Sequence, residues 1–190
     1  MIMNKLQDNK KNVVLAEQIR KGDKQAFTEL FEAYYVSLCE YAFRMLRDDE
    51  EEMEDIVQDL FSWIWKNRER FEPGISVRAY LYRSVYNRVI SRIRKKRFES
   101  HLDQNCQDHI KADQNNQIEE MQNRELGRAI AEAIQLLPEK RREIIILYLQ
   151  YELTYKEIAS ILNISVNTVD IQLRRARKLL CQKLKVYSLD

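Results

Sequence analysis

The segment Leu153–Arg177 constrains the fold more than any other part of the chain, because it is patterned as two short helices around a tight turn. Thr154 can cap the first helix, and Glu157 three residues later can complete a capping box. Asn163 falls at the turn, where a left-handed backbone is expected and asparagine tolerates it. Ser165 can cap the second helix. The segment therefore predicts a helix-turn-helix unit.

The two faces of this helix pair differ in chemistry. The inward positions are apolar or small at helical spacing, namely Ile158, Ala159, Leu162, Val169, Leu173 and Ala176. The outward face of the second helix has hydrogen-bonding side chains near its start and cations further along, namely Asn167, Thr168, Gln172, Arg174, Arg175 and Arg177. This order is typical of a recognition helix in a DNA major groove. An ordinary helical hairpin with a solvated basic face is the alternative interpretation.

The rest of the chain also favours helices. Glycine and proline account for only 3 and 2 of the 190 residues, and the apolar share of 45% is enough for packed cores. The three cysteines are widely spaced, which argues against a disulfide framework. The first residues have no apolar signal core, and the longest apolar run, Ile144–Leu149, is far too short to cross a bilayer. We expect an all-α cytoplasmic protein with no membrane insertion.

Helical periodicity continues through most of residues 1–98. It predicts helices over residues 13–21, 24–47 and 51–70, with Gly22 and Asp23 as a stop followed by a new cap. The acidic run Asp48–Asp55 suits the start of the third helix, or alternatively a patch for a basic partner. Trp63 and Trp65 cannot both lie on the apolar stripe of that helix. The stripe itself consists of Ile56, Val57, Leu60, Phe61 and Ile64.

A further helix, capped by Ser76, combines a core stripe with an aromatic and basic face. Its stripe is Leu81, Val85 and Val89. Cations neutralise phosphates, aromatic rings stack on unpaired bases, and an amide can read a base edge, so this face suits single-stranded DNA. A buried tyrosine cluster beside a solvated basic face is the alternative. The residues concerned are Tyr80, Tyr82, Arg83, Tyr86, Asn87, Ser91 and Arg94.

Residues 99–117 lose all periodicity and are rich in Asn, Gln and Asp, which predicts a flexible polar linker. His101, Cys106 and His109 lie in it at spacings that match no standard metal site, so we expect no metal. Periodicity returns at residue 118. Helices are expected over residues 119–135 and 140–150, and the second should be buried because it is apolar all round. The fold class is therefore two small helical domains, 1–98 and 118–190.

Together these segments resemble the sigma-70 family of bacterial RNA polymerase sigma factors, in its small extracytoplasmic-function (ECF) group. The matching stretches are spread over most of the chain. Gly22–Phe31 looks like the start of region 2, and Asp55–Phe61 with Trp65 looks like its polymerase-binding helix. Tyr80–Arg88 looks like the stretch that melts and reads the −10 element. Leu137–Arg142 and Leu153–Ala159 look like two parts of region 4, which reads the −35 element.

The resemblance implies a promoter-specificity subunit, with region 2 in residues 1–98 and region 4 in residues 118–190. Docking on core RNA polymerase would fall to Asp55, Gln58, Asp59, Phe61 and Trp65. The unpaired −10 strand would be held by Tyr80, Arg83, Tyr86, Asn87 and Arg88, with Lys95, Lys96 and Arg97 on backbone phosphate. The −35 duplex would be approached by Ser165, Asn167, Thr168, Ile171, Gln172, Arg174 and Arg175, with Arg177 on phosphate.

The implied partners are core RNA polymerase, promoter DNA in duplex and single-stranded form, and an anti-sigma factor covering the polymerase-binding face. No glycine-rich phosphate loop or nucleophile–base set is present, so we expect neither an enzyme nor a cofactor. The rival interpretation is a stand-alone helix-turn-helix regulator with an N-terminal sensor or dimerisation domain. The aromatic and basic helix argues against it, because a sensor does not need such a face.

Two positions depart from the family pattern or stay open. The family often has Asp four residues after the Asn that aligns with Asn87, and this chain has Ser91, which leaves the detail of −10 recognition open. Asp170 is acidic on a helix that would face phosphates. It could select a cytosine amino group, or it could shape which promoters are refused.

Overall fold

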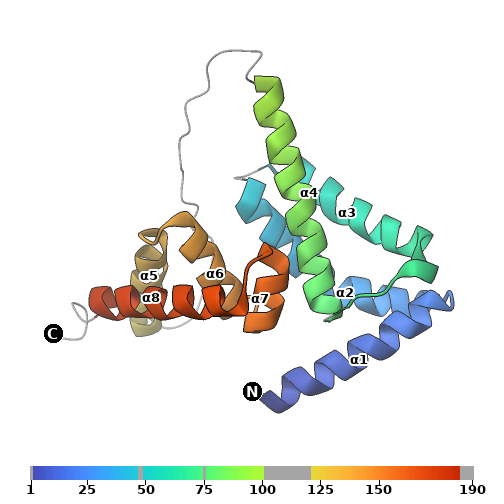
Figure 1. The fold of residues 1–190 in the computed structure, drawn as a ribbon, viewed down its shortest axis with the longest axis horizontal. Coiled ribbons are helices and arrows are strands. Elements are labelled where there is room, and N and C mark those ends of the chain that lie inside the picture. Colours follow the sequence, from blue (N-terminus) through green and yellow to red (C-terminus); the bar gives the residue numbers. More distant parts are fainter. Residues whose placement is uncertain (1, 47–48, 75, 101–120, 185–190) are drawn as a thin grey trace. The chain divides into compact units, whose positions relative to one another are not determined.

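The computed structural model describes residues 2–46, 49–74, 76–100 and 121–184, and every regular element in these ranges is helical (Figure 1). The chain divides into two compact units, Met1–Ile110 and Lys111–Asp190. The all-α prediction is therefore confirmed. The first unit holds α1 (Ile2–Arg20), α2 (Lys24–Leu46), α3 (Glu50–Lys66), the 3-10 helix η1 (Arg68–Arg70) and α4 (Val77–Ser100). The second holds α5 (Met121–Gln135), α6 (Glu139–Leu149), α7 (Tyr155–Leu162) and α8 (Val166–Leu184).

The junction between α1 and α2 follows from two residues. Gly22 ends α1 with a φ of 87°, a backbone conformation that glycine adopts without a steric penalty. The Asp23 carboxylate then caps α2 by accepting from the backbone N–H groups of Gln25 at 2.8 Å and Ala26 at 3.1 Å. The predicted stop and cap are confirmed. The predicted start of α1 at residue 13 is wrong, because the helix continues into a polar stretch that has no apolar periodicity.

The core of the first unit is built around α2, which packs against α1, α3 and α4. The Asp49 carboxylate caps α3, and the Ser76 hydroxyl caps α4 by accepting from the Ala79 N–H at 3.0 Å. Both apolar stripes predicted from the sequence are buried. In α3 they are Ile56, Val57, Leu60, Phe61 and Ile64, and in α4 they are Leu81, Val85 and Val89.

The core of the second unit is built around α8, which packs against α5, α6 and α7. Thr154 and Glu157 form the predicted capping box at the start of α7. Asn163 has the left-handed conformation expected at the turn, with φ 54° and ψ 47°. The Ser165 hydroxyl accepts from the Thr168 N–H at 2.9 Å and so caps α8. The helix-turn-helix prediction is confirmed, and its inner face on α8 is fully buried at Val169, Leu173 and Ala176.

Three expectations about element limits and burial need correction. α6 is not buried all round, because Leu149 at its end is 51% exposed. In α7 the inward residue is Ile161, at 1% exposed, while the predicted Leu162 is only partly buried. α4 continues to Ser100, so the last two residues of α4 are helical where the linker was expected to begin. Residues 101–117, with His101, Cys106 and His109, lie outside the described residues.

Candidate functional site

One side of α3 carries an exposed ridge of two acids and an indole. Asp55, Asp59 and Trp63 are spaced four residues apart, which places them in one row along the helix. Both carboxylates are exposed and have no ion-pair partner among the described residues, and Trp63 is 42% exposed. We call these three residues the α3 ridge. Unpaired carboxylates beside an exposed indole suit a cationic partner surface.

The other aromatic residues of α3 lie inside the unit. Phe61 is 2% exposed, and its ring lies 6.1 Å from that of Phe27 and 4.9 Å from that of Phe31, edge-on in both cases. Trp65 is half-buried, 5.1 Å from the Phe27 ring, with the Arg68 guanidinium 5.1 Å from its own ring centroid. Burial leaves little of the Phe61 ring for a direct docking contact, and that contact stays a prediction.

Among the predicted docking residues, Gln58 flanks the ridge, where it is hydrogen-bonded to Tyr35 of α2. Sequence reasoning weighed Trp63 but left it out of the docking set. The signal that identifies Trp63 is its position four residues after Asp59, on the polar side of the helix rather than on the apolar stripe. Asp55, Gln58 and Asp59 of the predicted docking set are therefore exposed on one side of α3, together with Trp63.

The tyrosines of α4 divide between the core and the outer face. Tyr82 is 3% exposed and lies 5.3 Å from the Tyr41 ring, and burial raises its pKa to about 12. Tyr80 is half-buried edge-on against Phe71 at 5.2 Å, and desolvation raises its pKa. Tyr86 is partly exposed. The buried pair of Tyr82 and Tyr41 therefore lies beside an outer face that keeps Tyr86, and the binding of unpaired DNA by this face stays a prediction.

The outer face of α4 presents the polar side chains expected there. Arg83 and Asn87 are exposed, Arg88 is partly exposed, and Ser91 and Arg94 continue the same row toward the helix end. The last turns extend past the other helices of the unit (Figure 1), and Phe98 there is 76% exposed. The predicted −10 residues that the structure describes thus all belong to α4, and among them Lys96 differs because its side chain pairs with carboxylates at the start of α3. The side chain of Arg97 lies outside the described residues.

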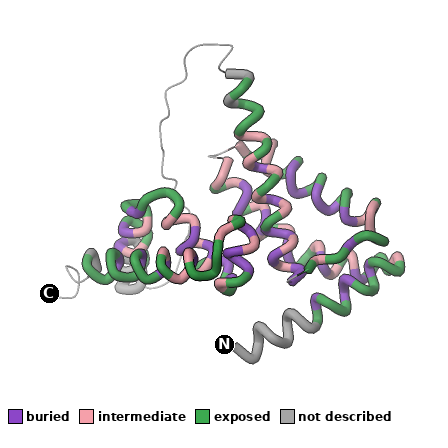
Figure 2. The backbone as a smooth tube through the Cα atoms, viewed as in Figure 1, coloured by how far each residue is buried: buried purple, intermediate pink, exposed green. Residues whose placement is uncertain are grey.

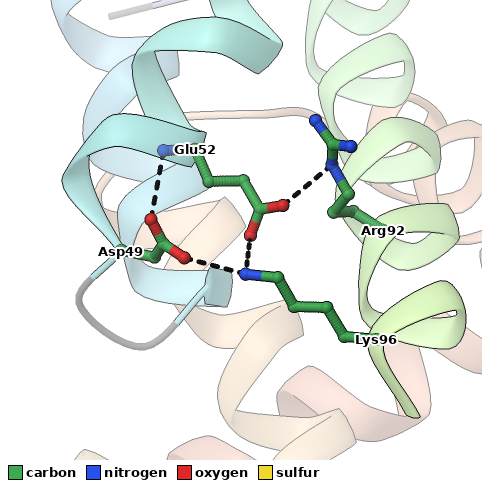
Figure 3. Close-up of polar contacts among 4 residues, drawn as sticks. All are labelled: Asp49, Glu52, Arg92 and Lys96. Atoms are coloured by element: carbon green, nitrogen blue, oxygen red, sulfur yellow. Dashed lines mark hydrogen bonds and ion pairs between the residues drawn. The ribbon is translucent and has the colours of Figure 1, made fainter. Parts of the chain in front are cut away.

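Lys96 belongs to an ion-pair cluster between α3 and α4, formed with Asp49, Glu52 and Arg92 (Figure 3). Its ammonium donates to the Asp49 carboxylate at 2.8 Å and also contacts the Glu52 carboxylate. Arg92 Nε lies 2.8 Å from the other Glu52 oxygen, and the Glu52 side chain is only 10% exposed. The Lys96 ammonium holds the pKa of Asp49 below its usual value, and the Asp49 carboxylate raises the pKa of Lys96.

The position of Lys96 on the helix explains this pairing. Arg92 and Lys96 follow Val89 at intervals of three and four residues, so they continue the stripe that packs inward. Lys96 therefore faces α3, whereas Arg94 lies on the exposed side. The phosphate contact predicted for Lys96 stays a prediction, and the two carboxylates compete with it.

The second unit presents its polar face on α8, where exposed positions recur along the helix (Figure 2). Asn167 and Arg175 are exposed, and Ile171 is 39% exposed. Ser165 and Thr168 share a hydroxyl–hydroxyl hydrogen bond of 2.8 Å at the helix start. The Gln172 amide oxygen accepts from Arg141 Nε at 3.1 Å, which fixes this side chain against α6.

The three arginines of α8 differ in what holds them. The Arg177 guanidinium lies 5.2 Å from the Tyr148 ring centroid and donates to the Tyr155 hydroxyl at 3.3 Å. Arg174 is paired with Asp170 one turn earlier. Arg175 has no ion-pair partner among the described residues. The face therefore contains one arginine on aromatic rings, one on a carboxylate and one open to solvent.

Both units of the chain match proteins of one known family. The description "Sigma-70 region 2" matches residues 30–99, and "Sigma-70, region 4" matches residues 127–180. The ECF RNA polymerase sigma factor SigW of Bacillus subtilis (strain 168) is 33% identical over 177 residues, which cover 89% of this chain and 94% of SigW. The chain belongs to the sigma-70 family, in its ECF group. The stand-alone regulator is not supported, because the N-terminal half of this sigma factor matches region 2.

Further relatives agree over nearly the whole length of the sigma factor. CnrH of Cupriavidus metallidurans is 29% identical over 172 residues, covering 86% of this chain and 89% of CnrH. A structure of CnrH with the cytosolic domain of CnrY has a TM-score of 0.60 at 27% identity, covering 93% of this chain and 98% of that one. The sigma factor RpoE of Bartonella quintana, solved with the anti-sigma factor NepR, has a TM-score of 0.65 at 25% identity, covering 84% and 97%.

No helix in the described ranges is both long and apolar enough to cross a membrane. Within the same ranges, no three His, Cys, Asp or Glu side chains gather as a possible metal-binding group.

Proposed function

We propose that this protein is a cytoplasmic, non-enzymatic sigma subunit that docks on core RNA polymerase and directs it to promoters with a −10 and a −35 element. The observation that carries the proposal is the pairing of two surfaces in one sigma-70 chain. Residues 1–98 present the aromatic and basic face of α4, which suits unpaired DNA, and residues 118–190 present the polar face of α8, which suits a major groove.

The division of labour follows from the chemistry of each face. Tyr86 can stack on an unpaired base, while Arg83 and Asn87 can engage phosphate and a base edge. On α8, Asn167 and Arg175 can reach a duplex. Each contact set is small, so each alone binds weakly. Once both sets are held on one polymerase, the second contact forms at a high effective concentration, and short elements suffice.

The α3 ridge is the proposed polymerase-docking surface. Its carboxylates, Asp55 and Asp59, would meet cations of the polymerase, and Trp63 would supply the apolar anchor. An anti-sigma factor is the further partner we propose, because the related CnrH and RpoE were solved with CnrY and the anti-sigma factor NepR. A regulator that covers the ridge would keep the sigma subunit from polymerase.

The docking proposal predicts that Trp63→Ala weakens association with core polymerase by about thirtyfold, the effect of losing an interface anchor of about 2 kcal/mol. Asp59→Ala should weaken it several-fold, with a reduced dependence on salt because one charge contact is lost. The measurement is titration of core polymerase with labelled full-length protein, followed by promoter-dependent transcription in vitro.

Glu32→Ala is the matched control, because it removes an exposed carboxylate from α2 and leaves the three ridge residues in place. It should bind core polymerase like the wild type. Wild-type affinity in both ridge variants would remove α3 from the interface. A wild-type protein that gives no promoter-dependent transcription with core polymerase would reject the proposed function itself.

The ion-pair cluster predicts separate effects for two neighbouring cations of α4. Lys96→Ala should lower the free energy of unfolding by about 1 kcal/mol, because it removes a partner of the largely buried Glu52 carboxylate. It should leave the salt dependence of promoter binding unchanged. Arg94→Ala should leave the free energy of unfolding unchanged. It should reduce the slope of log K against log salt by about one if Arg94 contacts a phosphate.

Urea unfolding and promoter binding by holoenzyme over a series of salt concentrations measure the two quantities. A Lys96→Ala variant with unchanged stability and a slope reduced by about one would instead support the phosphate contact predicted for Lys96.

A further inference from the structure

The acidic residue of the DNA-facing helix is joined to an arginine by both of its oxygens. Arg174 Nε lies 3.1 Å from Asp170 Oδ1, and one terminal nitrogen, Nη2, lies 2.8 Å from Asp170 Oδ2. The residues are one helical turn apart, with the acid on the N-terminal side. Two parallel contacts between a planar carboxylate and a planar guanidinium fix orientation as well as distance.

The exposure of the two side chains shows what the pair presents to a partner. The Asp170 side chain is 29% exposed, whereas the Arg174 side chain is 76% exposed. The carboxylate thus lies nearer the helix surface and the guanidinium projects from it. An arginine on the solvated face of a helix ordinarily samples many rotamers, and the two contacts with Asp170 favour one of them for Arg174.

The pairing leaves a defined part of the guanidinium for recognition. A guanidinium has five N–H groups, and the carboxylate takes the edge formed by Nε and Nη2. The remaining edge, between the two terminal nitrogens, presents two parallel donors. In the major groove, guanine offers two adjacent acceptors, O6 and N7, and no other base offers this pair. The open edge of Arg174 therefore matches guanine.

The same pairing makes Arg174 a poor phosphate ligand. Because the carboxylate balances the charge of Arg174, the pair gains little from the general attraction of cations to DNA. Arg175 has no such partner among the described residues and keeps its full attraction for the backbone. Asp170 is also less available to read a cytosine amino group itself, since its side chain is only 29% exposed and both of its oxygens are already turned toward Arg174.

We propose that Asp170 is a positioning residue that holds Arg174 for recognition of one guanine in the −35 element. The inference rests on the proposed function and deepens it. It assigns different roles to two neighbouring arginines: Arg174 recognises a base, and Arg175 binds the phosphate backbone of the DNA.

Holoenzyme made with full-length protein tests the proposal on promoter fragments carrying each of the four bases at each −35 position. Wild type should prefer guanine at one position by about tenfold to hundredfold. Arg174→Ala should abolish that preference. Asp170→Asn should reduce it at the same position by at least about fivefold and bind unrelated sequences as well as wild type or better, because a negative charge is lost. Asp170→Glu should restore part of it.

Controls separate positioning from stability and from general DNA affinity. Arg175→Ala should weaken binding equally on all sequences, and thermal unfolding of the Asp170→Asn protein should match wild type. Adding Asp170→Asn to Arg174→Ala should change the base preference no further. The proposal is overturned if Asp170→Asn keeps the full guanine preference, if it alters a different position, or if no guanine preference depends on Arg174. Failure of the wild-type holoenzyme to select any promoter would instead reject the proposed function.

Discussion

Phe61→Ala should lower the free energy of unfolding of the first unit by about 3–5 kcal/mol, the usual cost of deleting a buried phenylalanine side chain. Phe61 is 2% exposed, and its edge-on contacts with Phe27 and Phe31 would be lost with the ring. Since a domain of this size is stable by only about 5–15 kcal/mol, the variant should be close to unfolding at 37 °C. Urea unfolding followed by tryptophan fluorescence measures the effect, because Trp63 and Trp65 both belong to α3 of this unit.

Phe98→Ala is the matched control for the same residue type in the same unit. Phe98 is 76% exposed, so its removal should change stability by less than about 0.5 kcal/mol. Phe61→Leu keeps most of the buried volume and should cost less than about 1.5 kcal/mol while retaining polymerase binding. A stable Phe61→Leu protein that fails to bind polymerase would show that the ring itself makes the contact, contrary to its burial.

Glu143→Gln should stabilise the second unit by about 2 kcal/mol at pH 8 and have little effect near pH 4. Desolvation, and to a lesser extent the charge of Glu139 one turn earlier, raises the pKa of Glu143 from 4.5 to about 7. The folded state therefore binds this proton more tightly than the unfolded state does. The contribution of the protonated Glu143 carboxyl to the free energy of unfolding is fully present below the ordinary carboxyl pKa, and it is lost as the pH rises through about 7. Glutamine keeps the shape and removes the titration.

Hydrogen exchange at the amides of α6 and α8, measured from pH 5 to pH 8, reports on this unit separately from the first. The wild-type free energy of opening should fall across that range, after correction for intrinsic exchange, and the Glu143→Gln value should fall much less. Glu139→Gln is the control, because it removes only the smaller electrostatic contribution and should give a smaller gain. An unchanged pH dependence in Glu143→Gln would place the titrating group elsewhere.

Local signals predicted the local structure well. Thr154 with Glu157, Asn163 and Ser165 were each assigned from side-chain chemistry that acts within four residues, and each has the expected geometry. The apolar stripes of α3 and α4 were also correct, because a period of 3.6 residues over several turns determines which side of a helix is buried. These short-range rules explain why the all-α fold class could be predicted from the sequence.

Sequence patterns say less where more than one chain segment decides the outcome. Phe61 belongs both to the buried stripe and to the predicted docking set, and only the surrounding helices show that its ring is enclosed by Phe27 and Phe31. Lys96 pairs with Glu52, which is 44 residues away in sequence, so no local pattern indicates it. Leu149 ends an apolar run, yet it is 51% exposed. Periodicity identifies a helix face without identifying what covers that face.

Asp170 shows how a contact within one helix can still escape sequence reasoning. A spacing of four residues between an acid and an arginine is common on solvated helices and usually contributes little. The role proposed for the ion pair depends on its bidentate geometry and on the exposure of the guanidinium, and the amino-acid sequence alone indicates neither.

The two faces of α8 also affect how the chain can evolve. Val169, Leu173 and Ala176 hold the helix in its unit, while Asn167 and Arg175, which would meet DNA, are exposed on the other side. Gene duplicates could therefore diverge in promoter choice with little loss of stability. Fewer single substitutions should be tolerated at Asp170 and Arg174, because changing either residue alone leaves the charge of the other unmatched on α8. Divergence at this pair should require both positions to change together.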